Sequence, residues 1–482
     1  MTASPDPGLD RLALQVLLAS FPGTTVGDDA LRLLGSGLGG LCLFGSNTAV
    51  GTDAVAAYVA RVRAASPLAL VAIDEEGGDV TRLHAGTGSP FLGAGALGAA
   101  GDLALTRTTA AAIGAEIGGL GIDLALGPVA DVNSNPDNPV IGIRSFGADP
   151  DRVAAHVAAW VEGLQSAGPA ACAKHFPGHG DTRQDSHLEL PAIDVSSELL
   201  ARRELVPFRA AVGAGVAAVM TSHLVVPALD TEPATLSGPV LSLLRTPSAA
   251  GGLGFEGVIV SDALDMAGAS AGRGIPRAAV RSLVAGADLL CLGPDQDAGQ
   301  VRAVQREIVA AVGSGELAAE RLAEAADRVR RLAGRPRHVP VAPVDLDLRQ
   351  LEGAHAALRV EGDLPDLHGA LVVSVVTEPN IAVGPVPWGL PADVTVGPDD
   401  HVPPGREPLL VQVRDAHRRP EVRALLERTC ADRSVVVLEW GWPGDLGEAL
   451  AGVTRVVPFG SSRPSVAAVA EVLHGAGWAA PC

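Results

Sequence analysis

Chemically active side chains are concentrated between Lys174 and His187, where the sequence is KHFPGHGDTRQDSH. These fourteen positions hold three His, two Asp, one Lys and one Arg, together with Pro and Gly residues that turn the backbone. A surface loop seldom gathers imidazoles beside glycines unless it binds a ligand. The residue types therefore favour a catalytic or binding loop. A metal site and a solvated loop are the alternatives, and a metal site needs further fixed ligands and no competing lysine nearby.

Asp185 and His187 lie two positions apart in this loop. In an extended segment, residues two apart point to the same side of the backbone. A carboxylate beside an imidazole fixes the imidazole tautomer and raises its proton affinity, which suits a general acid or base near neutral pH. The pair indicates proton transfer, although an Asp-x-His pair alone is a weak signal.

A second segment, VIVSDALDMAGAS, ends an apolar run at Ser261 and Asp262. A carboxylate at the end of a buried strand can belong to an active site at a barrel mouth. It can equally cap the next helix, a position that Asp fills well. This segment alone leaves both interpretations open.

Two further segments combine apolar runs with charged residues. In VAIDEEGGDVTRL, Asp74 ends a strand, Gly77 and Gly78 allow close backbone approach, and Arg82 follows eight residues after Asp74. In NPVIGIRSFG, Arg144 lies in an otherwise apolar loop. Both segments provide charged groups that can bind a polar ligand.

The elements that position these residues alternate between short apolar runs and helical patterns from residue 9 to about 335. The runs are continuously apolar, which predicts strands buried on both faces of a parallel sheet. They are Gly40–Phe44, Leu68–Ile73, Leu124–Pro128, Ala170–Lys174, Val216–Thr221, Gly257–Ser261 and Leu289–Leu292. Over this length a (β/α)8 barrel fits best, and an open doubly wound sheet is the alternative.

Polar residues follow the predicted strands and favour the barrel. In a barrel, the carboxyl ends of all strands converge on one mouth, where the active site lies. The residues concerned are Asp74, Asp131, Lys174, His175, His223 and Asp262. An open sheet would spread them along its edge.

The sequence predicts an α/β protein with two domains, because 482 residues exceed what one core usually organises. We expect an N-terminal (β/α)8 TIM-like barrel at 1–335, a Pro-rich linker at 336–366 and a smaller α/β sandwich domain at 367–482. The strands expected in the second domain are Ala370–Val376, Leu409–Val413, Val435–Glu439 and Thr454–Val457.

The composition excludes several classes of partner. A formal net charge of -19 repels nucleic acids and anionic membrane surfaces, so we expect neither as a partner. The five cysteines form no C-x-x-C pair and indicate reduced thiols. The first residues lack an apolar signal core, and no long apolar run predicts a transmembrane helix. We therefore expect a cytoplasmic protein.

These motifs resemble those of glycoside hydrolase family 3, in particular its β-N-acetylglucosaminidases of peptidoglycan recycling. The resemblance rests on IDEEGG with Arg82, on NPVIGIRSFG, on KHFPGHGDTRQDSH and on SDALDM, which occur in the order of the family. It covers residues from about 10 to 335, and FGSSRPSVAAVAEVLHG near the end is similar to the second domain of two-domain members. The family's β-glucosidases lack the His-bearing loop, so this loop is highly specific.

The resemblance implies a role for each matching residue. Asp262 matches the nucleophile of a retaining mechanism, and His187 matches the acid/base with Asp185 as its partner. The matching substrate-binding residues are Asp74, Arg82, Arg144, Lys174 and His175. Asp79 departs from the pattern, because the family commonly has arginine there, and this leaves the preference for the leaving group in doubt.

The implied function is a retaining exo-acting β-N-acetylglucosaminidase that needs no metal or other cofactor. Its substrate would be a glycoside containing N-acetylglucosamine, with phosphate as a further possible partner. One alternative is a phosphorylase using the same site. Another is a non-catalytic sugar-binding protein, which would be expected to lack a catalytic residue. Asp262, Asp185 and His187 are all present.

Overall fold

A computed structural model describes residues 7–183, 190–270, 272–337, 345–378, 380 and 382–479. In this part of the chain, an eight-stranded parallel sheet has the order β10-β1-β2-β3-β6-β7-β8-β9. An isolated parallel bridge between Val260 and Leu289 joins the two end strands, so the sheet closes into a barrel. The strands are β1 (Leu17–Ala19), β2 (Gly40–Leu43), β3 (Leu70–Ile73), β6 (Leu124–Ala125), β7 (Ala170–Phe176), β8 (Ala218–Thr221), β9 (Val258–Val260) and β10 (Leu290–Cys291).

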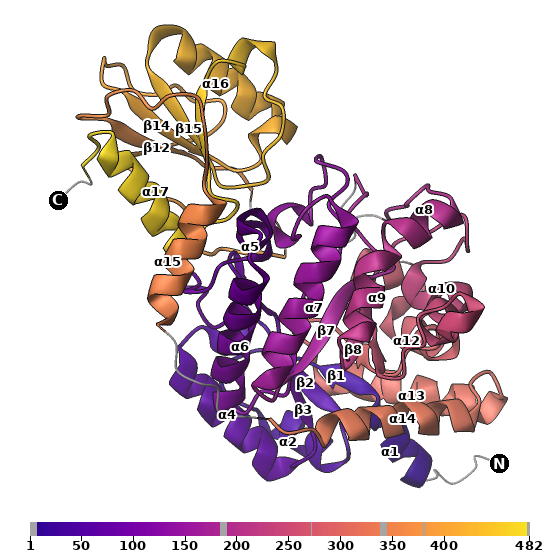
Figure 1. Cartoon of the computed structure of the whole chain (residues 1–482). Coiled ribbons are helices and arrows are strands. Elements are labelled where there is room, and N and C mark those ends of the chain that lie inside the picture. Colours follow the sequence, from indigo (N-terminus) through magenta and orange to yellow (C-terminus); the bar gives the residue numbers. More distant parts are fainter. Residues whose placement is uncertain are drawn as a thin grey trace.

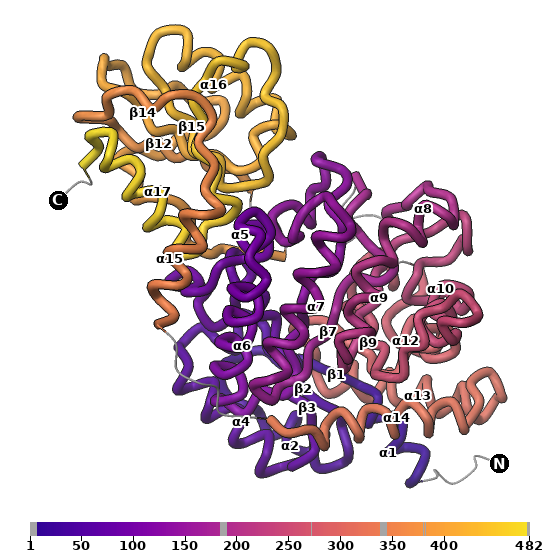
Figure 2. The backbone as a smooth tube through the Cα atoms, viewed as in Figure 1, coloured from indigo at the N-terminus to yellow at the C-terminus, as the bar shows by residue number. Residues whose placement is uncertain are grey.

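Helices surround this barrel (Figure 1), and the tube in Figure 2 follows the same chain path. The helices of this part are α1 (Pro7–Gln15), α2 (Asp28–Gly35), α3 (Gly45–Thr48), α4 (Thr52–Ala65), α5 (Ala94–Ala100), α6 (Leu103–Gly119), α7 (Pro150–Ser166), α8 (Ser197–Arg202), α9 (Leu205–Gly213), α10 (Gly238–Arg245), α11 (Ala267–Ser270), α12 (Gly274–Ala285), α13 (Ala298–Ser314) and α14 (Ala319–Ala333). Short 3-10 helices occur at η1 (Gly142–Arg144), η2 (Ala234–Leu236) and η3 (Ser248–Ala250). The barrel expectation is confirmed.

The barrel strands bury both of their faces, as their continuous apolar runs predict. Alternate residues such as Leu70 and Ala72 belong to a core inside the barrel. Their neighbours Val71 and Ile73 belong to the larger core between barrel and helices. Leu332 of α14 packs into the inner core, which identifies α14 as a cover for one end of the barrel. Because both faces are buried, each strand contributes apolar contacts to two cores.

A second, six-stranded sheet occurs in the described part after residue 345, with the order β11-β16-β15-β14-β12-β13. Helices α16 and α17 cover opposite sides of it (Figure 1), because their side chains belong to two separate cores. The elements are α15 (Leu346–Ala357), β11 (Arg359–Glu361), β12 (Leu371–Val375), β13 (Val394–Val396), β14 (Leu409–Val413), η4 (Ala416–Arg418), α16 (Pro420–Asp432), β15 (Val435–Glu439), η5 (Glu448–Leu450), β16 (Thr454–Val457) and α17 (Arg463–Gly475).

The structure corrects the sequence expectation for part of the range 336–366, which was predicted to be linker. Helix α15 packs against α5 and α17, and strand β11 pairs antiparallel with β16. Gln350 of α15 is buried and accepts a hydrogen bond from the N–H of Leu92 at 2.7 Å. The Pro-rich composition nearby concealed this segment, because α15 buries Gln350, Gly353, Ala354 and Ala357 instead of its leucines, and β11 is largely exposed.

No helix in the described ranges combines the length and the apolarity needed to cross a membrane.

Candidate active site

A cavity of about 730 Å³ opens at the carboxyl ends of the barrel strands. Of its charged and imidazole lining residues, Lys174 and His175 lie in β7, Asp74 directly follows β3, and Asp262 follows β9 after one residue. The others belong to the connections that follow β3, β6, β7 and β9. The whole set is Asp74, Glu76, Arg82, Arg144, Lys174, His175, His179, Asp262 and Asp265. The strand ends thus converge on one mouth, as the barrel interpretation requires.

Asp262 follows β9 after a single residue and lines this cavity. Its backbone N–H donates to the Thr221 hydroxyl at 3.3 Å, and its carboxylate accepts from the N–H of Ala263 at 2.8 Å. Helix α11 begins only at Ala267, so Asp262 does not occupy its N-cap position. The alternative of a helix-capping aspartate therefore does not explain this residue.

Lys174 lies in β7 with only 3% of its side chain exposed and bridges two carboxylates. Its Nζ lies 2.7 Å from Asp74 Oδ1 and 2.7 Å from Glu76 Oε1. Arg144 binds Glu76 with two nitrogens, Nη2 to Oε1 at 2.8 Å and Nε to Oε2 at 3.1 Å. Arg82 Nη2 lies 3.7 Å from Asp74 Oδ2. These five side chains form a buried ion-pair network along one wall of the cavity.

The network sets the protonation of its members. Burial acts to raise the pKa of Asp74, but the charges of Lys174 and Arg82 outweigh it and hold that pKa below its usual value. The pKa of Glu76 is lowered in the same way by Arg144 and Lys174, against burial. Burial acts to lower the pKa of Lys174, yet Asp74 and Glu76 raise it. Both carboxylates and the ammonium are therefore charged near neutral pH.

Lys174 is also the only lysine in the sequence, although Lys and Arg together number 36. An ammonium is a compact point charge that can place two carboxylate oxygens at hydrogen-bond distance from one atom. A guanidinium spreads its charge over a planar fork and suits bidentate pairs such as Arg144 with Glu76. The two residue types thus match the geometry of their contacts.

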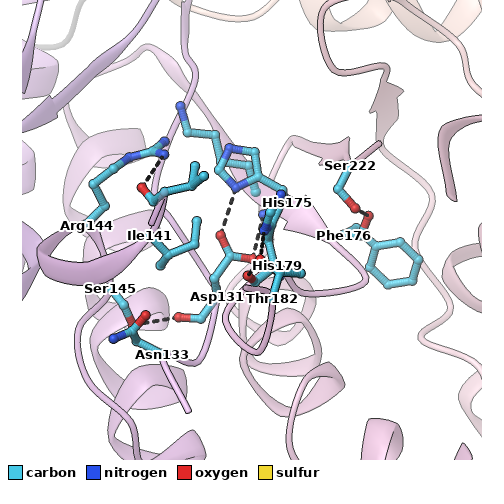
Figure 3. A network of polar contacts seen from close by, with 12 residues as sticks. Asp131, Asn133, Ile141, Arg144, Ser145, His175, Phe176, His179, Thr182 and Ser222 are labelled. Carbon is cyan, nitrogen blue, oxygen red and sulfur yellow. Dashed lines mark hydrogen bonds and ion pairs between the residues drawn. The ribbon is translucent and has the colours of Figure 1, made fainter. Parts of the chain in front are cut away.

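His175 and His179 are held by one buried carboxylate, Asp131 (Figure 3). Asp131 accepts from the backbone N–H groups of His175 and His179 at 3.1 and 2.7 Å, and its other oxygen lies 2.8 Å from His175 Nδ1. Burial acts to raise the pKa of Asp131, but His175 and His179 lower it, so Asp131 is an ionised acceptor. His175 Nδ1 therefore donates, which leaves Nε2 for another partner.

His179 behaves differently, although it also lines the cavity. Burial lowers the pKa of His179 to about 4, so its ring is neutral near neutral pH. Its Nδ1 lies 2.8 Å from the hydroxyl of Thr182. We interpret His179 as a neutral, fixed part of the wall.

The second sheet domain reaches the cavity at Ala382. Ala382 lines the cavity, and its carbonyl accepts a hydrogen bond from Arg82 Nη2 at 3.1 Å. Asn380 Nδ2 donates to the carbonyls of Pro139 and Val140 at 3.0 and 2.9 Å. Both domains therefore contribute to the boundary of the candidate site.

The structure brings together six of the predicted site residues, all of which line the cavity. They are Asp74, Arg82, Arg144, Lys174, His175 and Asp262. Asp185 and His187 lie outside the described residues. Sequence reasoning placed Asp131 at the barrel mouth without giving it a contact, and it assigned no role to Glu76 or His179. Glu76 could have been found, because it lies two residues after Asp74, and such residues can share one side of an extended segment.

Asp79, the departure from the family pattern, lies away from the cavity. It is buried, and its carboxylate contacts Ser461 and Arg414 of the second domain. Among the described residues, no group of three or more His, Cys, Asp or Glu side chains is arranged to hold a metal ion.

A closed parallel barrel with carboxylates and cations at its mouth defines a class of enzyme whose active site faces a polar substrate. A family model described as "Glycosyl hydrolase family 3 N terminal domain" matches residues 23–332. The match covers more than half of the chain, so the chain belongs to glycosyl hydrolase family 3 and is a glycoside hydrolase.

Similar proteins agree with this assignment. A protein named Beta-hexosaminidase from Chromobacterium violaceum is 36% identical over 340 residues, which cover 68% of this chain and 88% of that protein. Beta-hexosaminidase A from Pseudoalteromonas piscicida is 34% identical over 302 residues. These residues cover 58% of this chain and 50% of that relative, so the match spans about half of the relative's length. A solved glycoside hydrolase family 3 beta-N-acetylglucosaminidase from Paenibacillus sp. str. FPU-7 is 32% identical, with a TM-score of 0.84 and 97% of each chain covered.

Proposed function

We propose that this protein is a retaining, exo-acting β-N-acetylglucosaminidase that releases terminal N-acetylglucosamine from cell-wall-derived or related glycosides. The observation that carries the proposal is the shared cavity of Asp262 and the ion-pair network around Lys174. The names of the relatives support an N-acetylhexosamine substrate. They favour hydrolysis over the phosphorylase alternative.

Asp262 is the proposed nucleophile. Its carboxylate attacks the anomeric carbon and forms a glycosyl ester, while the bond from that carbon to the leaving oxygen breaks. His187, oriented by Asp185, gives its proton to the leaving oxygen. Water then attacks the same carbon, returns a proton to His187 and releases Asp262 as a carboxylate. The sugar leaves with its original configuration.

The network around Lys174 is the proposed sugar-binding wall. Asp74 can accept hydrogen bonds from sugar hydroxyls because its lowered pKa keeps it ionised. Arg82, Arg144 and Lys174 can donate charge-assisted hydrogen bonds to hydroxyl or N-acyl oxygens. His175 donates through Nδ1 to Asp131, so its neutral ring can present Nε2 as an acceptor for a sugar hydroxyl.

Two broader proposals accompany this function. We propose that residues 1–335 carry the chemistry and that residues 367–482, together with β11, form the second domain, while the rest of the segment between them joins the two. We also propose a cytoplasmic location and a role in peptidoglycan turnover. Free cysteines at Cys42, Cys172 and Cys291 are buried, which is consistent with a reducing compartment.

The test compares nitrophenyl β-N-acetylglucosaminide with nitrophenyl β-glucoside. We expect turnover of the first to exceed that of the second by orders of magnitude. Asp262→Ala should lower the rate by several orders of magnitude without loss of fold. Asp265→Ala is the matched control, because Asp265 follows three residues later and lines the same cavity. A residual rate within about tenfold of wild type in Asp262→Ala would contradict the nucleophile assignment.

A further inference from the structure

A short β-hairpin carries part of the sugar-binding wall. Strands β4 (Glu75–Gly77) and β5 (Val80–Thr81) pair antiparallel, with Gly78 and Asp79 at the tip. Gly78 has φ +60, and a Cβ there would lie 2.5 Å from the Cα of Gly93, so the tip can only be made with glycine.

The two arms of the hairpin both lead to the cavity. Glu76 lies in β4, and Arg82 follows β5. Glu75 Oε2 accepts from the N–H groups of Arg82 and Leu83 at 2.9 and 3.1 Å, which fastens the arms to each other. A displacement of the tip is therefore expected to move Glu76 and Arg82.

The tip is held by the second domain through Asp79, whose relative exposure is 6%. Asp79 Oδ1 accepts from the N–H of Ser461 at 2.7 Å. Asp79 Oδ2 accepts from the Ser461 hydroxyl at 3.1 Å and from Arg414 Nη2 at 3.3 Å. We call Asp79, Arg414 and Ser461 the Asp79 cluster. Within the described residues, the hydrogen-bond partners of the Asp79 carboxylate thus come from the second domain.

The turn that receives Asp79 has a strained backbone. Phe459 has φ +55, which is uncommon for a bulky residue, and Gly460 has φ +131. A Cβ at Gly460 would lie 3.4 Å from Asp79 Oδ1. Ser462 then caps α17, so the carboxylate of Asp79 lies near the positive end of that helix. Strain of this kind persists only where surrounding contacts fix the turn, and it is concentrated at functional positions.

We propose that Asp79 is a positioning residue, through which the second domain holds the hairpin so that Glu76 and Arg82 face the sugar. The proposal rests on the proposed function. The bond from Arg82 to the carbonyl of Ala382 fixes the far arm of the same hairpin. Together these contacts give the second domain a defined part in substrate binding.

The chain offers a matched control in Asp123, which is 7% exposed. Like Asp79, it accepts from a backbone N–H, that of Val71 at 2.6 Å, and from arginines, with Arg337 Nε at 2.7 Å. It directly precedes β6, at the amino end of the barrel, opposite the cavity. Asp123→Asn should therefore destabilise the fold without touching the sugar-binding wall.

The experiment measures KM and kcat on nitrophenyl β-N-acetylglucosaminide for Asp79→Asn, Asp79→Ala, Ser461→Ala and Asp123→Asn, with thermal unfolding of each. We expect KM to rise at least about fivefold in Asp79→Ala, with a smaller change in kcat, because sugar contacts are lost while Asp262 stays in place. Asp79→Asn and Ser461→Ala should give intermediate values. Arg414→Gln combined with Asp79→Asn should be less than additive.

Equal KM values for Asp79→Ala and Asp123→Asn would overturn the proposal, whatever their unfolding temperatures. If Asp79→Ala does not fold, the KM of Ser461→Ala is the deciding measurement. A KM equal to that of the wild-type protein would then overturn the proposal. Amide exchange of Arg82 and Leu83 in the free protein is independent of activity. Faster exchange there in Asp79→Ala than in Asp123→Asn supports the proposal even if wild type fails to cleave the substrate, a result that would refute only the proposed function.

Discussion

Replacing Lys174 by methionine should move the acidic limb of the activity profile to higher pH. In the native protein, Lys174 is the largest influence that opposes burial and keeps the pKa of Asp74 low. A unit charge at the 2.7 Å separation of Nζ and Oδ1 contributes ~6 kcal/mol at an effective dielectric constant of ~20. Rearrangement and the remaining Arg82 recover much of this in the variant.

We therefore expect the pKa of Asp74 to rise by ~1–2 units, since one unit corresponds to ~1.4 kcal/mol. The direction follows from the proton balance. Asp74 must be ionised to accept from sugar hydroxyls, and a higher pKa keeps it protonated to higher pH. The limb of kcat/KM that rises with pH should therefore shift upward by the same amount.

The assay is kcat/KM on nitrophenyl β-N-acetylglucosaminide across the acidic range. Breaking a buried ion pair costs about 3–5 kcal/mol of stability, so the variant must first be shown to stay folded at each pH. Lys174→Arg is the control, because it keeps the charge but changes the shape. It should lose activity without moving the limb. If the kcat/KM profile of Lys174→Met is lowered at every pH but its acidic limb is not shifted along the pH axis, the electrostatic reasoning is refuted.

Three further predictions concern proton transfer, the need for a metal, and the choice between water and phosphate as the acceptor of the sugar. His187→Ala should lower the rate of hydrolysis of an unactivated N-acetylglucosaminide far more than that of the nitrophenyl substrate, and Asp185→Ala should have the same effect in a milder form. Equal losses of rate on both substrates would show that His187 has a structural role instead. Dialysis against a strong chelator should leave the rate unchanged, since Lys174 places a cation beside the histidines; restoration of a lost rate by zinc would contradict this. Phosphate at constant ionic strength should accelerate turnover and give some N-acetylglucosamine 1-phosphate beside free sugar, because a deprotonated His187 is neutral and does not repel the dianion. A rate that does not change with phosphate concentration, with free sugar as the sole product, would exclude phosphorolysis.

The barrel was predictable because its strands are short, continuously apolar and regularly spaced. Strand β1 was missed because it follows the end of α1 within one apolar stretch. In such a stretch, the spacing of apolar residues does not show where a buried helix ends and a buried strand begins. Strands β11 and β13 were missed for another reason: they are short and partly exposed, so they lack the apolar run that marked β14 and β15.

The site was predictable where it depends on strand ends, as at Asp74, Lys174 and Asp262. The part that joins the domains was not, because Asp79 and Ser461 are separated by 382 positions and no local pattern relates them. Asp79 is polar in a Gly-rich turn, where a solvated side chain is the usual expectation. Only the packing of the two domains shows that its carboxylate is buried and where its partners come from.

One signal for the site was present in the composition itself. Arginine supplies 35 of the 36 basic residues, that is 36 less the single Lys174. Where a sequence uses arginine at nearly every cationic position, a lysine indicates a place where a guanidinium does not fit. Lys174 Nζ meets two carboxylates at 2.7 Å while its side chain is almost fully buried, a geometry that a planar fork cannot reproduce without displacing Asp74 or Glu76. The residue type and the contact geometry thus point independently to Lys174 as the centre of the ion-pair network in the cavity, which is why its charge and its shape are tested by separate substitutions.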